Sequence, residues 1–225
     1  MGLYKNLTIA FFGSGGTGKT TYSIISGIQS LIMMGYSVDK AVELASLLTL
    51  FDAETTINFF DNLISERQWT PFIIIDDVGS QISKYWIFLK KLYWAQYFSI
   101  LDHVKDWCGV LILTAKHKKR APAGIRDIID MEVLSYETDV VGKDGRIYTM
   151  TIMEFKTVEP SKTIYVDIIP SGMKMPDVIW NKMLETRSMI GSERIKKIKE
   201  EIEREKAVKE RVAMKDEEGD DDDEL

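Results

Sequence analysis

Residues 13–20, GSGGTGKT, hold the densest group of positions suited to chemistry. They match the pattern G-x-x-x-x-G-K-[ST], in which glycines allow backbone N–H groups to turn toward a phosphate. An apolar run, LTIAFF, precedes the stretch, and a helical pattern follows it. The positive end of that helix would add to the field at a bound anion. We therefore predict a phosphate-binding loop made of Gly13, Ser14, Gly15, Gly16, Thr17, Gly18, Lys19, Thr20 and Thr21.

Two residues of this loop have specific expected roles. The Lys19 ammonium would neutralise the β- and γ-phosphates of a nucleotide, and the Thr20 hydroxyl would ligate Mg²⁺. A glycine-rich turn with a purely structural role gives no reason for a lysine at this position. The expected ligands are therefore ATP and Mg²⁺.

A pair of acids ends a second apolar run, FIIIDD, at residues 72–77. Asp76 is the candidate for the Mg²⁺ shell, and Asp77 is the candidate for the carboxylate that orients or polarises an attacking water. The plainer interpretation is that both acids cap the end of the strand. Two adjacent carboxylates would repel each other without a cation, which favours the metal-binding interpretation.

The run GVLILT, at residues 109–114, is a third buried strand. The hydroxyl of Thr114 at its end could sense the γ-phosphate, or it could simply bond to the backbone. Arg126 could reach the γ-phosphate of an adjacent subunit as an arginine finger, and Arg120 is the alternative candidate for this role. A basic cluster lies between Thr114 and Arg126, and a solvated loop, a contact to nucleic-acid phosphates and a subunit contact all remain open for it. The cluster consists of Lys116, Lys118, Lys119 and Arg120, with His117 inside it.

The element order predicts an α/β three-layer core with a central, mostly parallel sheet, since apolar strands alternate with helical patterns. After residue 131, two strand-like runs joined by GKDG predict a β-hairpin extension, with TIYVDII as a possible third strand. Helices are expected over 175–190 and 192–214. The predicted organisation is a core with its extension at 1–170, a C-terminal helical segment at 171–215 and a disordered acidic tail at 216–225.

The charge and composition of the chain limit which cellular compartments and which kinds of partner are expected. The chain has 29 basic and 35 acidic residues, and its formal charge is −6. The tail DEEGDDDDEL carries much of the acidic excess, so it is either a solubilising segment or a site for a protein partner. The apolar runs are too short for a membrane span. A single cysteine, Cys108, predicts a buried thiol in a reducing compartment, which favours the cytoplasm, or the host cytoplasm for a viral protein.

The chain resembles the additional-strand P-loop ATPases, a group that includes AAA+, RecA-like and packaging ATPases. The resemblance is carried by four features in this order: GSGGTGKT, FIIIDD, the polar strand end LILT and a downstream arginine. The segment IDDVGS resembles that of DnaA-type initiators and DnaC-type helicase loaders. Similar short ATPases occur in archaeal viruses and plasmids. The segment after residue 131 lacks the pattern of a four-helix lid, so the chain is closer to RecA-like, packaging-type or Zot-like members.

The resemblance implies an ATP hydrolase that forms a homo-oligomer and handles DNA, or a DNA-bound protein, in replication initiation, helicase loading or genome packaging. The alternatives are a small-molecule kinase of the nucleotide type and a nucleotide-dependent switch that remodels proteins. A kinase would normally add an arginine-rich lid, and residues 36–70 contain one arginine, Arg67. An aromatic stretch at 85–98 could belong to the core or to a partner interface.

Overall fold

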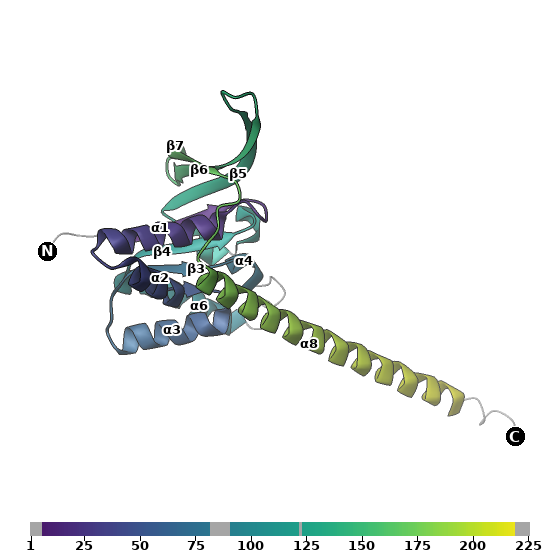
Figure 1. The fold of residues 1–225 in the computed structure, drawn as a ribbon. Helices are drawn as coiled ribbons and strands as arrows, with labels where there is room; N and C mark the ends of the chain where they lie inside the picture. The colour runs from purple at the N-terminus through teal and green to yellow at the C-terminus, as the bar shows by residue number, and fades with distance from the viewer. Residues whose placement is uncertain (1–5, 82–90, 122, 219–225) are drawn as a thin grey trace, which may run out of the picture. The chain divides into compact units, whose positions relative to one another are not determined.

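The computed structural model describes residues 6–81, 91–121 and 123–218. Its centre is a seven-stranded sheet with the order β2-β3-β4-β1-β5-β6-β7 (Figure 1). The pairs from β2 to β5 are parallel, and β5-β6 and β6-β7 are antiparallel. The strands span Leu7–Phe12 (β1), Thr49–Leu50 (β2), Thr70–Ile75 (β3), Cys108–Ala115 (β4), Met131–Val141 (β5), Ile147–Thr157 (β6) and Lys162–Pro170 (β7).

Local sequence signals define the first helices. Ser37 caps α2 by accepting a hydrogen bond from Lys40 N, and Asp52 caps α3 by accepting one from Thr55 N. Gly35, with φ of 97°, follows the end of α1, where a left-handed residue commonly ends a helix. The helices span Lys19–Met33 (α1), Val38–Leu47 (α2), Ala53–Ser65 (α3), Val78–Gln81 (α4), Lys91–Val104 (α6), Ala123–Arg126 (α7) and Asp177–Glu218 (α8), with 3-10 turns at Lys105–Trp107 (η1) and Lys118–Arg120 (η2).

The sheet and helices form three layers, as predicted. Helix α1 lies on one face of the sheet and α3 on the other (Figure 1). The largest apolar cluster joins the strands to the α3 and α6 side, with Phe60, Ile73 and Leu101 fully buried. Tyr97 is buried in the same cluster, so this member of the aromatic stretch belongs to the core. Tyr85, Trp86 and Phe88 lie outside the described residues.

The extension after residue 131 is a three-stranded arm, which we define as β5, β6 and β7. Strand β5 pairs with β1 only through Ile9↔Met131 to Phe12↔Leu134, and its remaining residues continue past the end of β1. The predicted hairpin and its possible third strand are both present. The same β5 strand that completes the parallel part of the sheet therefore also begins the arm.

The C-terminal segment differs from the prediction. A single helix, α8, replaces the two helices expected over 175–190 and 192–214 and continues to Glu218. A glycine in a helix interior costs only about 1 kcal/mol, which does not by itself end a helix at Gly191. The chain divides into two compact units after Trp180. In the second unit, the apolar side chains of Ile195, Ile198 and Ile202 are exposed.

None of the helices in the described ranges combines the length and the apolar content that crossing a bilayer requires. Cys108 is buried as expected, and burial raises the pKa of its thiol to about 12.

Candidate functional site

The glycine-rich loop joins the end of β1 to the start of α1, as its flanking patterns predicted. Gly18 adopts φ of 69° directly before Lys19, the first residue of α1. Only glycine enters this left-handed region at little cost. Gly13 is required for another reason, because a Cβ atom there would lie 2.2 Å from the backbone oxygen of Ser135. The loop therefore depends on glycine both for its turn and for its close approach to β5.

The ammonium of Lys19 lies inside the loop. Its Nζ donates to the carbonyl oxygens of Gly13 and Ser14 at 2.9 and 2.7 Å, and contacts Thr17 Oγ1 at 3.3 Å. Burial lowers the pKa of the Lys19 ammonium, while the nearby Asp76 and Asp77 carboxylates act in the opposite direction. The lysine is thus a buried cation between the loop and the acids, where an anionic phosphate would be attracted.

Three motifs that are distant in sequence meet at Asp76, at the end of β3. Thr20 Oγ1 donates to Asp76 Oδ1 at 2.5 Å, although the two residues are 56 positions apart. Thr114 Oγ1, at the end of β4, donates to the same oxygen at 2.8 Å. Asp76 and Thr114 are both buried. The loop, the acid pair and the polar strand end therefore form one site at the carboxyl edge of the sheet.

Asp77 follows Asp76 in a left-handed backbone conformation, with φ of 47°. Aspartate tolerates this region better than most residues. Its backbone N–H donates to Thr114 Oγ1 at 2.8 Å. The Thr114 hydroxyl consequently accepts from one acid's backbone and donates to the other acid's side chain, so it fixes the turn that carries both carboxylates. The predicted alternative, in which Thr114 bonds only to the backbone, accounts for just one of its two hydrogen bonds.

The donor set around Asp76 suits a magnesium ion that arrives with a nucleotide. Across residues 6–81, 91–121 and 123–218, no three His, Cys, Asp or Glu side chains gather to hold a metal by themselves. Thr20 and Asp76 offer two hard oxygen ligands at one point. Mg²⁺ prefers oxygen ligands, keeps several waters and completes its shell from substrate phosphates. These residues therefore fit the predicted cation.

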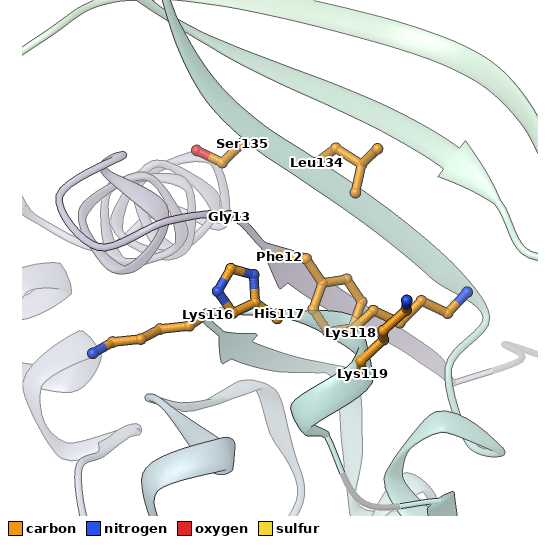
Figure 2. Close-up of a pocket in the computed structure, with 8 residues that line it drawn as sticks. All are labelled: Phe12, Gly13, Lys116, His117, Lys118, Lys119, Leu134 and Ser135. Carbon is orange, nitrogen blue, oxygen red and sulfur yellow. The ribbon is translucent and has the colours of Figure 1, made fainter.

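Lys116, His117, Lys118 and Lys119 of the basic cluster line a cavity of about 550 Å³ beside the loop (Figure 2). The side chain of Lys116 extends away from those of Lys118 and Lys119 (Figure 2). Lys118 forms an ion pair with Glu132 of β5. The positive charge of nearby Lys116 lowers the pKa of the Lys19 ammonium, so Lys116 contributes to the electrostatic field at the loop. The cavity is lined by Phe12, Gly13, Lys116, His117, Lys118, Lys119, Leu134 and Ser135.

Arg126 lies at the end of the short helix α7 and is exposed. The described part of this single chain contains no ion pair between Arg126 and an acid. An exposed arginine leaves its guanidinium available for a group outside the chain, which is the arrangement that an arginine finger requires.

Ser135 is a site residue that sequence analysis missed. It is buried on β5, and its Oγ donates to the carbonyl oxygen of Thr17 in the loop at 2.6 Å. A polar side chain inside the apolar strand pattern EVLSY was the available signal. That signal could not name a partner, because Ser135 and Thr17 are 118 positions apart.

No family model matches the chain. It is 21% identical to the uncharacterized protein B-251 of Sulfolobus spindle-shape virus 1, over 85% of this chain and 78% of that protein. This relative agrees with the predicted resemblance to proteins of archaeal viruses.

Solved structures with related folds share 10–12% sequence identity with the chain. They include the genome packaging NTPase B204 of Sulfolobus turreted icosahedral virus 2 with ATP-gammaS (TM-score 0.43; 76% of this chain, 100% of that chain). They also include the flagellar accessory protein FlaH of Methanocaldococcus jannaschii (0.40; 72% and 84%) and the N-terminal domain of zonular occludens toxin of Neisseria meningitidis (0.39; 79% and 98%).

These TM-scores are low, and the fold assignment rests on the chain's own geometry. Strand β4 is inserted between β1, which carries the loop, and β3, which carries Asp76. The fold is a three-layer P-loop NTPase fold with a central, mostly parallel sheet.

Proposed function

We propose that the protein hydrolyses ATP at the site formed by the loop and Asp76. The observation that carries this proposal is the convergence of the Thr20 and Thr114 hydroxyls on one oxygen of Asp76, beside the buried Lys19 ammonium. A structural βα turn would have no use for a buried cation and a buried carboxylate at the same strand edge. Preorganised groups of this kind stabilise the charge of phosphoryl transfer.

The residues divide the chemistry among them. The loop N–H groups and Lys19 bind and neutralise the phosphates, and the side chains of Thr20 and Asp76 hold Mg²⁺. When bound, Mg²⁺ supplies charge neutralisation at the phosphate oxygens. Asp77 orients the attacking water and accepts its proton, and Thr114 keeps Asp76 and Asp77 in register through its two hydrogen bonds. This assignment follows the predicted roles of Lys19 and Asp77, whereas Thr114 positions the two acids instead of sensing the γ-phosphate.

We further propose that hydrolysis is coupled to DNA handling, with DNA or a DNA-bound protein as the partner. The support is the position of Lys116, Lys118 and Lys119 directly after Thr114, around a cavity that also touches the loop. Ammonium groups at this position could contact backbone phosphates while remaining close to the γ-phosphate site. A phosphate contact there would offset the charge of Lys116, which lowers the pKa of the Lys19 ammonium.

The test is ATP hydrolysis by the purified protein alone, with single-stranded DNA and with duplex DNA. Lys19→Ala is the catalytic control, and Lys119→Ala is the DNA-contact variant. We expect DNA to stimulate hydrolysis in the wild type, the stimulation to weaken in Lys119→Ala, and all hydrolysis to be lost in Lys19→Ala. Hydrolysis that ignores both forms of DNA would overturn the coupling, and nucleotide binding without hydrolysis would overturn the ATPase itself.

Arg126 would act on the site of a neighbouring subunit, which requires a homo-oligomer. A mixing experiment tests this directly. Arg126→Ala and Lys19→Ala are each expected to be inactive alone, but mixed subunits should regain activity where an Arg126→Ala site meets a Lys19→Ala neighbour that supplies its arginine. Failure of the mixture to regain activity would argue against action in trans. An exposed arginine elsewhere on the same unit, Arg146, is the matched control substitution.

A further inference from the structure

We propose that Ser135 is a positioning residue for the phosphate-binding loop, and that it holds the Thr17–Gly18 peptide in the orientation that binds phosphate. This inference rests on the proposed function, because it concerns how that site is kept competent. Its basis is the 2.6 Å hydrogen bond that Ser135 Oγ donates to the Thr17 carbonyl oxygen. Both residues are buried, so the bond is protected from water.

The geometry of a trans peptide determines what this bond does. The C=O of Thr17 and the N–H of Gly18 belong to one planar unit and point in opposite directions. With the Thr17 oxygen held toward β5, the Gly18 N–H is directed away from β5. A flipped peptide would withdraw this donor and would aim a carbonyl oxygen at the phosphate instead.

The loop needs such a restraint because Gly18 is conformationally permissive. With φ of 69° and open space around its Cβ position, Gly18 adds no steric barrier against a rotation of its peptide. The N-terminus of α1 also provides no restraint on this peptide, because no side chain caps it. The Ser135 hydroxyl supplies a restraint on the peptide itself from outside the loop, from a position 118 residues later in the chain.

Ser135 itself is fixed by the strands around it. The ladder between β1 and β5 ends at Phe12↔Leu134, so Gly13 and Ser135 are the first residues beyond it. There the Ser135 carbonyl oxygen lies so close to Gly13 that a Cβ atom would meet it at 2.2 Å. Ser135 thus touches the loop near its start through the backbone and near its end through the side chain.

A second contact holds the arm against α1. Tyr22 Oη donates to Asp167 Oδ2 of β7 at 2.8 Å, and the ring of Tyr22 packs on Phe155 of β6 with a centroid distance of 6.2 Å. Because Met153 pairs with both Ser135 and Asp167, these three residues form one row across the arm. The row that positions the loop is therefore anchored to the helix that follows the loop.

The test compares four proteins: the wild type, Ser135→Ala, Ser135→Thr and Ser23→Ala. Ser23 is the matched control, since it is a buried serine whose hydroxyl bonds to the backbone oxygen of Lys19 within α1, at 2.9 Å. Ser135→Thr keeps the hydroxyl and adds one methyl group. Calorimetry gives the dissociation constants for ATP and ADP with Mg²⁺, and amide exchange of residues 14–18 is followed without nucleotide.

We expect Ser135→Ala to weaken ATP and ADP binding equally, by about fivefold to tenfold, the effect of one buried hydrogen bond. Its loop amides should exchange faster than those of the wild type. Ser135→Thr should bind within about twofold of the wild type, and Ser23→Ala should lower the melting temperature without changing affinity.

Unchanged affinity and unchanged exchange in Ser135→Ala would overturn the inference, as would an equal loss of affinity in Ser23→Ala. The failure of the proposed function has a different signature, because the wild type would then bind neither nucleotide. In that case loop exchange still decides the role of Ser135: faster exchange in Ser135→Ala supports positioning, and equal exchange overturns it.

Discussion

The two faces of the arm differ in what they are built to contact. The row Ser135–Met153–Asp167 lies against the loop and α1, where Ser135 and Met153 are buried and both polar members are hydrogen-bonded. The next row, Tyr136–Ile152–Ile168, projects from the opposite face, because successive side chains in a strand alternate. Tyr136 and Ile168 are exposed there, by 45% and 56%.

The difference shows that the two polar side chains of the inner row each have a hydrogen-bond partner outside the arm, whereas the outer row faces solvent. Ser135 bonds to the loop and Asp167 bonds to Tyr22 of α1, whereas the large apolar side chains of Tyr136 and Ile168 are exposed. The two inner bonds depend on the exact positions of the loop and of α1. The outward row makes no comparable demand, so the two rows are expected to respond very differently to substitution.

Asp76→Asn should have the largest effect on the inner side. The amide keeps an acceptor for Thr20 and Thr114, so the fold should survive, but the charge that binds Mg²⁺ is lost. We expect ATP hydrolysis to fall by at least about 100-fold. Phosphate release measures the effect, and Asp61→Asn on the exposed face of α3 is the isosteric control. Activity retained in Asp76→Asn would remove Asp76 from the mechanism.

The two rows can be compared directly by Met153→Ala and Ile168→Ala. Met153 is fully buried, so its truncation should lower the free energy of unfolding by about 2–4 kcal/mol. Truncation of the exposed Ile168 should cost less than about 1 kcal/mol. Urea denaturation of both variants provides the measurement. Equal losses would mean that the outer row is covered in solution.

Gly13→Ala tests the close approach of the arm to the loop. The new methyl carbon would lie 2.2 Å from the Ser135 carbonyl oxygen, so the two strands must separate there. We expect a loss of about 2 kcal/mol in unfolding free energy. Gly15→Ala is the control in the same loop, because no atom lies within 4 Å of its Cβ position. A similar loss in both variants would locate the cost in the loop backbone and not in the contact with Ser135.

Cys108 gives the smallest predicted effect, and it depends on pH. Burial raises the pKa of this thiol from 9.0 to about 12, so the folded protein keeps a proton that the unfolded chain releases. Stability from this group is complete below pH 9 and is lost as the pH rises toward 12. Between pH 8 and 10 the loss should be about 1 kcal/mol. Cys108→Ala should lack this component when unfolding of the two proteins is compared at both pH values.

Much of the fold could be predicted because its signals are local. Ser37 and Asp52 cap helices through bonds to residues three positions away, and Gly35 ends α1 by its own backbone conformation. The expected break near Gly191 was wrong, because a single glycine is only a weak local signal. Helix α8 continues through it. Ser135 was missed because a serine in an apolar strand carries no information about its partner.

The sequence by itself determined the loop, the apolar strand runs and the acid pair, since neighbouring residues specify each of them. Only the tertiary structure decided that Thr20 and Thr114 share one oxygen of Asp76, and that a serine of the arm holds the Thr17 carbonyl. The physical reason is that strand order and register determine which strand ends meet. Those depend on how the whole sheet packs, and no short segment contains that information.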